Sequence, residues 1–130
     1  ELELFEKALP YFLKYNFNDP DSIFMAGLCY LKINDYEKAL EYFDLYLKFE
    51  EPNPELNYYK GLCLFEKEDF KSAAKLFKQL IKNDENNSDA LYKLGICYVE
   101  LNKMREAKKI LNNLYYIDMG LYDSLNIFIN

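Results

Sequence analysis

Apolar and polar positions along the chain alternate with the period of an amphipathic helix. The clearest example starts at Tyr36, from which apolar side chains recur at intervals of three and four residues. This apolar face consists of Tyr36, Ala39, Leu40, Phe43, Tyr46 and Leu47. Charged side chains, among them Lys38, Glu41 and Lys48, occupy the other positions. The pattern predicts a helix with one buried and one solvated face.

Residue types also recur at a fixed interval of 34 residues. The recurring positions are Gly27, Gly61 and Gly95; Cys29, Cys63 and Cys97; Ala39, Ala73 and Ala107; Tyr36, Phe70 and Met104; and Phe43, Phe77 and Leu111. Three of the four glycines and all three cysteines share this register. A fixed period of this length indicates an array of stacked structural repeats.

Each repeat predicts two helices joined by a short turn. An Asp or Asn followed by Pro or Ser marks the start of the first helix, because the side-chain oxygen caps the helix and Pro is tolerated at its first position. These starts are Asp19-Pro20, Asn53-Pro54 and Asn87-Ser88. The first helices should end where polar pairs interrupt the apolar period. The ends are Ile33, Lys67 and Leu101, followed by Asn34-Asp35, Glu68-Asp69 and Asn102-Lys103.

The repeats organise the chain as one domain of five segments. For residues 1–18 the pattern predicts the second helix of a truncated or atypical repeat. We expect Pro10 to kink this helix or to delay its start. Repeats 1, 2 and 3 comprise residues 19–52, 53–86 and 87–120. Residues 121–130 predict the start of a further or capping helix, which begins at Asp123 after a helix end at Gly120. We expect the natural protein to continue at both ends, since a solenoid leaves its end faces apolar unless they are capped.

The glycines inside the first helices predict close helix packing. Glycine inside a helix costs about 1 kcal/mol relative to alanine, so a packing reason is expected. We expect Ala39, Ala73 and Ala107 of the second helices to face these glycines. The two backbones would then approach to about 8 Å, the lower limit of ordinary helix packing.

The pattern resembles the tetratricopeptide repeat family, whose 34-residue motif has the same glycine, the second-helix alanine and the aromatic residue that follows it. The resemblance covers residues 19 to about 120. It implies an all-α fold, a right-handed superhelical solenoid of antiparallel helical hairpins. Repeat 2 departs from the motif at Asn57, where a bulky residue is expected, and at Lys60, which replaces a leucine. We expect Tyr58 and Tyr59 to fill the space.

The resemblance also implies a binding surface, because first helices of such arrays line a concave groove and second helices form its back. The apolar and aromatic positions implied for the groove are Phe24, Leu28, Leu31, Tyr58, Leu62, Phe65, Tyr92, Ile96 and Val99. The acidic positions at its rim and far end are Asp21, Glu55, Asp89, Glu66 and Glu100. An apolar patch with a charged rim is typical of a partner site. Packing between first helices is an equally good interpretation of Leu28, Leu62 and Ile96.

The chemistry of this groove predicts the kind of partner. Phe24, Leu28 and Asp89 occupy positions at which family members that hold acidic C-terminal tails have Lys or Asn. An apolar or amphipathic segment with basic flanks therefore fits better. We expect a protein–protein interaction scaffold. Two alternatives stay open: a small chaperone that shields an apolar client before secretion or assembly, and a module that self-associates through the groove or the end faces.

Composition argues against catalysis, nucleic-acid binding and membrane insertion. The net charge is −6 and the chain has no His, the commonest acid–base catalyst and metal ligand. No apolar stretch approaches the roughly 20 residues of a membrane span, and no enzyme, metal-site or cofactor motif occurs. The cysteines are interpreted as small buried residues, because equivalent positions of stacked helices lie too far apart for a disulfide. Three free thiols favour a reducing, cytoplasmic location.

Overall fold

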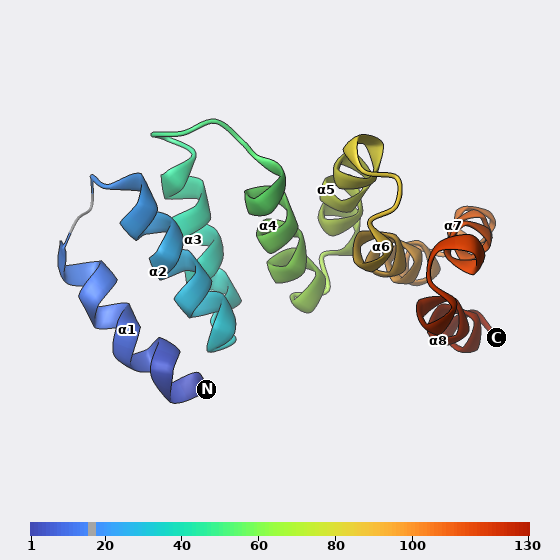
Figure 1. Ribbon diagram of the computed structural model, residues 1–130, viewed down its shortest axis with the longest axis horizontal. Coiled ribbons are helices and arrows are strands. Elements are labelled where there is room, and N and C mark those ends of the chain that lie inside the picture. The colour runs from blue at the N-terminus through green and yellow to red at the C-terminus, as the bar shows by residue number, and fades with distance from the viewer. Residues whose placement is uncertain (16–17) are drawn as a thin grey trace. The chain divides into compact units, whose positions relative to one another are not determined.

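The computed structural model describes residues 1–15 and 18–130 (Figure 1). Within these residues the chain forms eight helices joined by short connections, and no strand. The helices are α1 (Leu2–Tyr15), α2 (Pro20–Lys32), α3 (Tyr36–Tyr46), α4 (Pro54–Glu66), α5 (Phe70–Asn83), α6 (Ser88–Glu100), α7 (Met104–Ile117) and α8 (Met119–Ile129). The all-α class implied by the resemblance is confirmed.

Side-chain caps start the first helix of each repeat at the expected residue. Oxygens of Asp19, Asn53 and Asn87 accept hydrogen bonds from backbone N–H groups three residues further along, at 3.1, 2.9 and 3.1 Å. Pro20 and Pro54 lie in the first turns of α2 and α4, where a missing N–H costs nothing. The three predicted helix starts are therefore confirmed.

The first helices also end where the sequence predicts. Asn34, Glu68 and Asn102 adopt the left-handed backbone region, with φ of 65°, 63° and 59°. A left-handed residue directly after a helix stops it and satisfies its last carbonyl groups. The next residue begins the second helix: Asp35 and Asp69 cap α3 and α5 through their carboxylates. Lys103 stands at the same position before α7 and makes no side-chain cap hydrogen bond.

Residues Glu1–Lys67 form one compact unit. The hairpin of α2 and α3 is its centre, α1 packs against α2, and α4 packs against α3. Fully buried Phe43 and Leu56 dominate one apolar cluster of this unit, and Ala26 and Leu9 belong to a second cluster that joins α1 to α2. The unit therefore consists of one complete hairpin with a helix on either side of it.

Residues Glu68–Asn130 form the second compact unit. Here α5 packs against α6, α6 packs against α7, and α8 contacts both α6 and α7. Leu91, Leu114 and Leu125, from α6, α7 and α8, are fully buried. The last helix therefore completes a core that the α6–α7 hairpin begins.

The structure shows where both terminal helices begin. Helix α1 starts at Leu2 and continues through Pro10, so this proline does not delay the helix start. Gly120 lies inside the first turn of α8, so the helix end predicted there and the start predicted at Asp123 are wrong. The physical reason is Asp118, which follows α7 directly and caps α8 by accepting a hydrogen bond from the Leu121 N–H at 3.0 Å. A cap one residue after α7 removes the need for a left-handed glycine.

Gly27 and Gly95 of the first helices are closely packed, and the side chains nearest to them are large and apolar. A Cβ atom placed on Gly27 would lie 2.6 Å from Cε1 of Phe43. A Cβ atom on Gly95 would lie 2.6 Å from Cδ2 of Leu125. Ala39 of α3 is also fully buried. The missing side chain of each of these glycines therefore makes room for a large apolar group.

Replacing Gly27 by alanine should destabilise the fold. The new methyl group would overlap the buried Phe43 ring, and overpacking of this kind costs about 1–3 kcal/mol. That cost outweighs the roughly 1 kcal/mol that alanine gains in a helix. Gly120→Ala is the matched control, because its nearest neighbour outside the local backbone lies 3.4 Å away. Urea unfolding followed by circular dichroism should show a loss for Gly27→Ala and no loss for Gly120→Ala.

Lys103→Asp should stabilise the chain, since it supplies the cap that α7 lacks. Asp at this position reproduces the geometry of Asp35, whose carboxylate accepts from the Lys38 N–H at 3.2 Å. The gain should be about 0.5–2 kcal/mol, helped by removal of a positive charge from a helix N-terminus. Asp35→Ala should cause a loss of similar size in the same urea titration. A loss for Asp35→Ala without any gain for Lys103→Asp would contradict the expectation.

Candidate functional site

Phe24, the first residue of the predicted groove, lies in a cluster of aromatic rings. Its ring centroid is 5.7 Å from that of Phe43, 5.4 Å from that of Tyr46 and 6.1 Å from that of Tyr59. Such separations suit tilted and edge-to-face aromatic pairs. The rings come from α2, α3 and α4, so contacts within the cluster join these three helices. Phe24 is half-buried in it, and only part of the ring is accessible to a partner.

The other two groove positions of repeat 1 differ in accessibility. Leu31 is 8% exposed and belongs to the core of the first unit, so it offers little surface to a ligand. Leu28 is half-buried and packs against the same core. Packing inside the first unit therefore buries much of the apolar surface that these α2 residues could offer to a partner.

Helix α4 keeps more of its predicted strip accessible. Tyr58, Leu62 and Phe65 are half-buried, whereas Leu56 on the same helix is fully buried. Leu56 thus supplies the bulky core side chain that repeat 2 lacks at Asn57. The neighbouring Tyr59 stacks with the Phe43 ring, as expected of a residue that fills this space. The Tyr58 ring meets Tyr59 edge-on at 5.6 Å.

The repeat 3 positions lie in the second unit, on α6. Tyr92, Ile96 and Val99 are half-buried, beside residues of α6 such as Leu91 that are fully buried. The Lys93 ammonium lies 6.0 Å from the centroid of the Tyr92 ring, at the outer limit of a cation–π contact. The structure therefore groups the repeat 1 and repeat 2 positions in one unit and the repeat 3 positions in the other.

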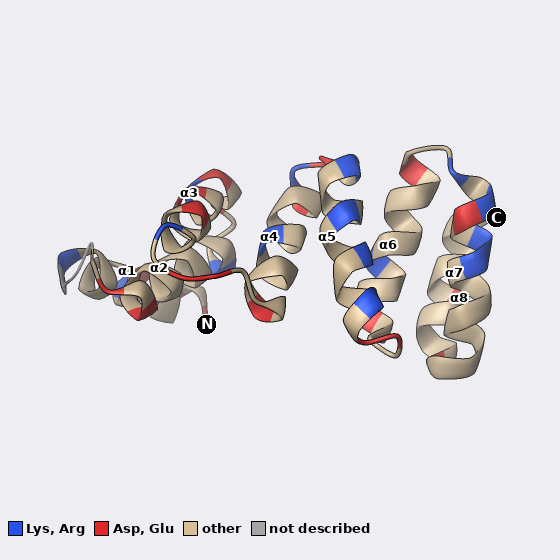
Figure 2. Cartoon of the chain, turned by 90° about the horizontal axis from the view of Figure 1, so that it is seen from above, with Lys and Arg blue, Asp and Glu red and all other residues tan. Residues whose placement is uncertain are grey.

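The predicted acidic rim is largely exposed. Four of its five carboxylates are solvent-exposed, and Asp89 is half-buried; the exposed ones are Asp21, Glu55, Glu66 and Glu100. The net charge of −6 resides entirely in the first unit, since the second has equal numbers of acidic and basic residues. Acidic segments on α3 and on the connection to α4 stand out in Figure 2. The first unit should therefore attract cationic groups.

Ion pairs already occupy several lysines of this acidic unit. Nζ of Lys60 lies 2.7 Å from Oδ1 of Asp44, which explains why repeat 2 tolerates a lysine where its motif has leucine. Lys38 pairs with Glu41 at 3.3 Å, and Lys67 pairs with Glu37. Exposed pairs of this kind stabilise by about 1 kcal/mol at most. These pairs leave fewer lysine ammonium groups to neutralise the carboxylates of the acidic rim.

The cysteines are buried free thiols, as interpreted from the sequence. Burial raises the pKa of Cys63 and of Cys97 to about 12, and it raises the pKa of Cys29 as well. A neutral thiol is a poor nucleophile and a poor metal ligand. In the described ranges, no three Cys, Asp or Glu residues are grouped so as to hold a metal ion.

Helix length and hydropathy decide whether a helix can cross a membrane. No helix in residues 1–15 and 18–130 has both the length and the apolar character needed to cross a bilayer.

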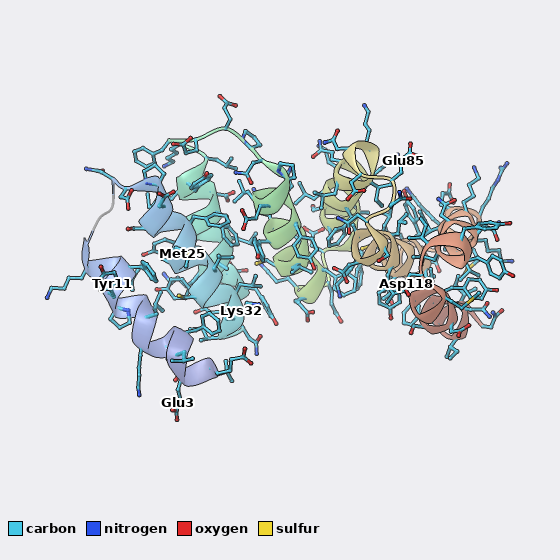
Figure 3. All side chains as sticks on the ribbon, viewed as in Figure 1. Glu3, Tyr11, Met25, Lys32, Glu85 and Asp118 are labelled. Atoms are coloured by element: carbon cyan, nitrogen blue, oxygen red, sulfur yellow. The ribbon has the colours of Figure 1, made fainter. Side chains whose placement is uncertain are left out.

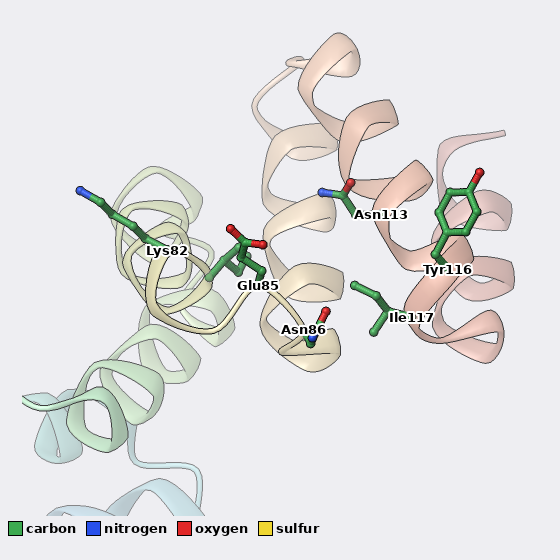
Figure 4. A pocket seen from close by; sticks show the side chains of 7 residues that line it. Lys82, Glu85, Asn86, Asn113, Tyr116 and Ile117 are labelled. Carbon is green, nitrogen blue, oxygen red and sulfur yellow. The ribbon is translucent and has the colours of Figure 1, made fainter.

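Concave surfaces also occur where the sequence did not indicate them. A small cavity of about 170 Å³ lies between α1 and the end of α2. Phe5 and Lys32 are among its lining residues, and Lys32 is labelled in Figure 3. A larger one of about 600 Å³ lies between the end of α5 and the end of α7, with Asn86, Asn113 and Tyr116 among its lining residues (Figure 4). No periodic signal marks these residues, so the sequence pattern could not reveal them.

A third concavity, of about 200 Å³, is lined mainly by lysines. Lys71, Lys75 and Lys78 of α5 line it together with Lys103. Their spacing of three and four residues along α5 is visible in the sequence, but it is also typical of an ordinary solvated helix face. Only the fold shows that Lys103, from another segment, adds to the same surface.

Comparison with protein families identifies a match over much of the chain. The model of the family described as "Anaphase-promoting complex, cyclosome, subunit 3" matches residues 34–114. No protein of curated function matches the chain by sequence.

Solved structures with the same fold are numerous. YrrB, described as a TPR protein with an unusual peptide-binding site, is 22% identical with a TM-score of 0.81, over 95% of this chain and 66% of YrrB. MamA from Desulfovibrio magneticus RS-1 is 23% identical with a TM-score of 0.80, over 88% of this chain and 66% of that protein. Another MamA structure is 19% identical with a TM-score of 0.76, over 96% of this chain and 84% of MamA. The expected tetratricopeptide fold is confirmed.

The buried thiols should resist modification in the folded chain. A thiol with a pKa of about 12 is ionised to roughly one part in ten thousand at pH 8, so an aromatic disulfide reagent should label Cys63 and Cys97 at least ~100-fold more slowly than an exposed cysteine. Tyr116→Cys supplies that exposed control, since Tyr116 is 85% exposed. Labelling of the buried thiols should rise with pH toward 12, whereas the control should level off near about pH 9. Rapid labelling of the unmodified folded chain at pH 8 would contradict this.

Proposed function

We propose that this chain, which belongs to the family described as anaphase-promoting complex, cyclosome, subunit 3, is a protein-interaction scaffold with no catalytic chemistry of its own. One observation carries the proposal: apolar side chains on the first helices stay half-buried while the opposite faces of the same helices are fully buried. Tyr58, Leu62 and Phe65 of α4 show this best. Large side chains held in this way offer apolar contact area at little cost in conformational entropy.

The proposed ligand is an apolar or amphipathic segment of a partner protein. Aromatic residues such as Tyr58 and Tyr92 combine a large apolar surface with a polar tip, and they are typical anchors of protein interfaces. The exposed carboxylates of Asp21, Glu55 and Glu66 favour a segment with basic flanks, which they would attract before contact. YrrB, with its peptide-binding site, supports peptide recognition by this fold.

The tyrosine anchors provide the test. Affinity capture from the source cell with the unmodified chain identifies a partner, and fluorescence polarisation then measures the Kd of its binding segment. Combined Tyr58→Ala and Tyr92→Ala substitutions should weaken that binding about tenfold or more, as expected of aromatic anchors. Tyr116→Ala is the matched control, since Tyr116 lies on α7 and outside the strip. Equal affinity of all three chains, with unchanged helicity, would refute this site.

Two alternative functions give different results in the same experiments. A chaperone that shields an apolar client should suppress aggregation of the captured protein, which a scaffold need not do. A self-associating module should show a mass that rises with concentration in light scattering. The exposed Ile127 and Phe128 of α8 would be its first candidates for substitution by glutamate. A monomeric mass at all concentrations would exclude this alternative.

A further inference from the structure

The lysine-lined cleft on α5 has a composition unlike that of the groove. Lys71, Lys75 and Lys78 of α5 line it, and so does Lys103, the residue before α7. Ala74, Tyr98 and Leu101 supply the apolar part of its lining. We propose that this cleft is a second docking site, which binds an acidic, amphipathic segment of a partner protein.

The charge of the cleft supports an anionic ligand. All four lysines are solvent-exposed, and within the described part of the chain none of them takes part in an ion pair. The lysines of the first unit differ, since three of them are paired with carboxylates. Burial raises the pKa of Tyr98 and the nearby Glu106 carboxylate raises it further, so Glu106 brings negative charge to the cleft. Asp69, the N-cap of α5, is a second carboxylate close in sequence to Lys71. The four lysines outnumber these carboxylates, so the cleft carries a net positive charge, and lysine positions along α5 are blue in Figure 2.

The spacing of the lysines fits carboxylates on a helix. Residues four apart on a helix have Cβ atoms about 6 Å apart, so Lys71 and Lys75 match two acidic residues at the same spacing. Lys71 and Lys78 are separated by about 10 Å along the axis of α5. An acidic helix with an apolar residue between its carboxylates would place that residue against Tyr98 and Leu101. Its affinity would combine charge with burial of apolar surface.

Other anions fit this surface less well. No arginine lines the cleft, and arginine is the side chain best suited to grip phosphate with two hydrogen bonds. The net charge of −6 opposes the approach of a long polyanion or an anionic bilayer. A short acidic peptide needs only the local positive potential. Protein is therefore the ligand class that the cleft favours.

The cleft and the proposed groove use different residues. Tyr98 borders the cleft while its neighbour Val99 belongs to the predicted strip, and successive residues on a helix point about 100° apart. Variants of one surface thus leave the other intact. The chain would hold two partner segments of opposite charge.

A labelled peptide tests the cleft directly. The probe is a fluorescein-labelled helical peptide with Glu at intervals of three and four residues and Leu between them, and a version with Lys in place of Glu is its control. Polarisation with the full chain should show binding of the acidic peptide alone, at least about tenfold weaker in about 0.5 M salt. No binding, or binding that salt leaves unchanged, would overturn the proposal.

Charge-reversal variants show where the probe binds. Lys71→Glu with Lys78→Glu should raise the Kd at least tenfold, whereas Lys108→Glu with Lys109→Glu, an equal charge change at exposed positions of α7 outside the cleft, should change it less than about twofold. Equal losses in both variants would mean general charge attraction and would overturn the proposal. Lys103→Asp should weaken binding although it supplies a helix cap, and Tyr92→Ala should leave binding unchanged. Tighter binding of poly-uridine RNA or phosphatidylserine vesicles than of the peptide, lost in the same cleft variant, would assign the cleft to those anions.

Discussion

The contact between the Phe43 ring and the backbone of Gly27 is the constraint on which the first unit depends. A side chain on Gly27 would occupy the space of the ring, which is fully buried. With the ring in this place, Phe24 and Tyr59 gather around it and connect α2, α3 and α4. The same contact thus fixes the helix that carries the accessible Tyr58. In this unit, the packing around Phe43 therefore supports both the stability of the fold and the position of the proposed binding surface.

The two units differ in net charge, although their helices are packed in a similar way. The first unit holds the whole net charge, and the second presents a lysine cleft within a balanced total. Charges at this distance from the cores contribute little to stability but much to the choice of partner. The two units repeat one architecture and still offer different surfaces. A scaffold of this kind would distinguish partners by charge before apolar contacts form.

Local sequence was enough to predict the helix starts at Asp19, Asn53 and Asn87, because a cap needs only the side chain and the next three backbone groups. The end of α7 shows where such reasoning failed. Gly120 suggested a helix end, but Asp118 caps α8 two residues earlier. Two valid local signals lay close together, and a single sequence does not state which of them prevails. For the strip on the first helices, the resemblance supplied candidate positions but not how much of each side chain stays accessible: Leu31 is buried, whereas Tyr58 is half-buried.

The sequence by itself determined the helices, the 34-residue hairpin and the buried cysteines, since these follow from periodicity, capping and apolar character along one segment. Only the tertiary structure decided which groups meet: Phe43 against Gly27, Leu31 within the core, and Lys103 beside the lysines of α5. The physical reason is that such contacts join separate helices. Their geometry depends on side-chain volume and on packing of the whole unit, which no short stretch of sequence contains.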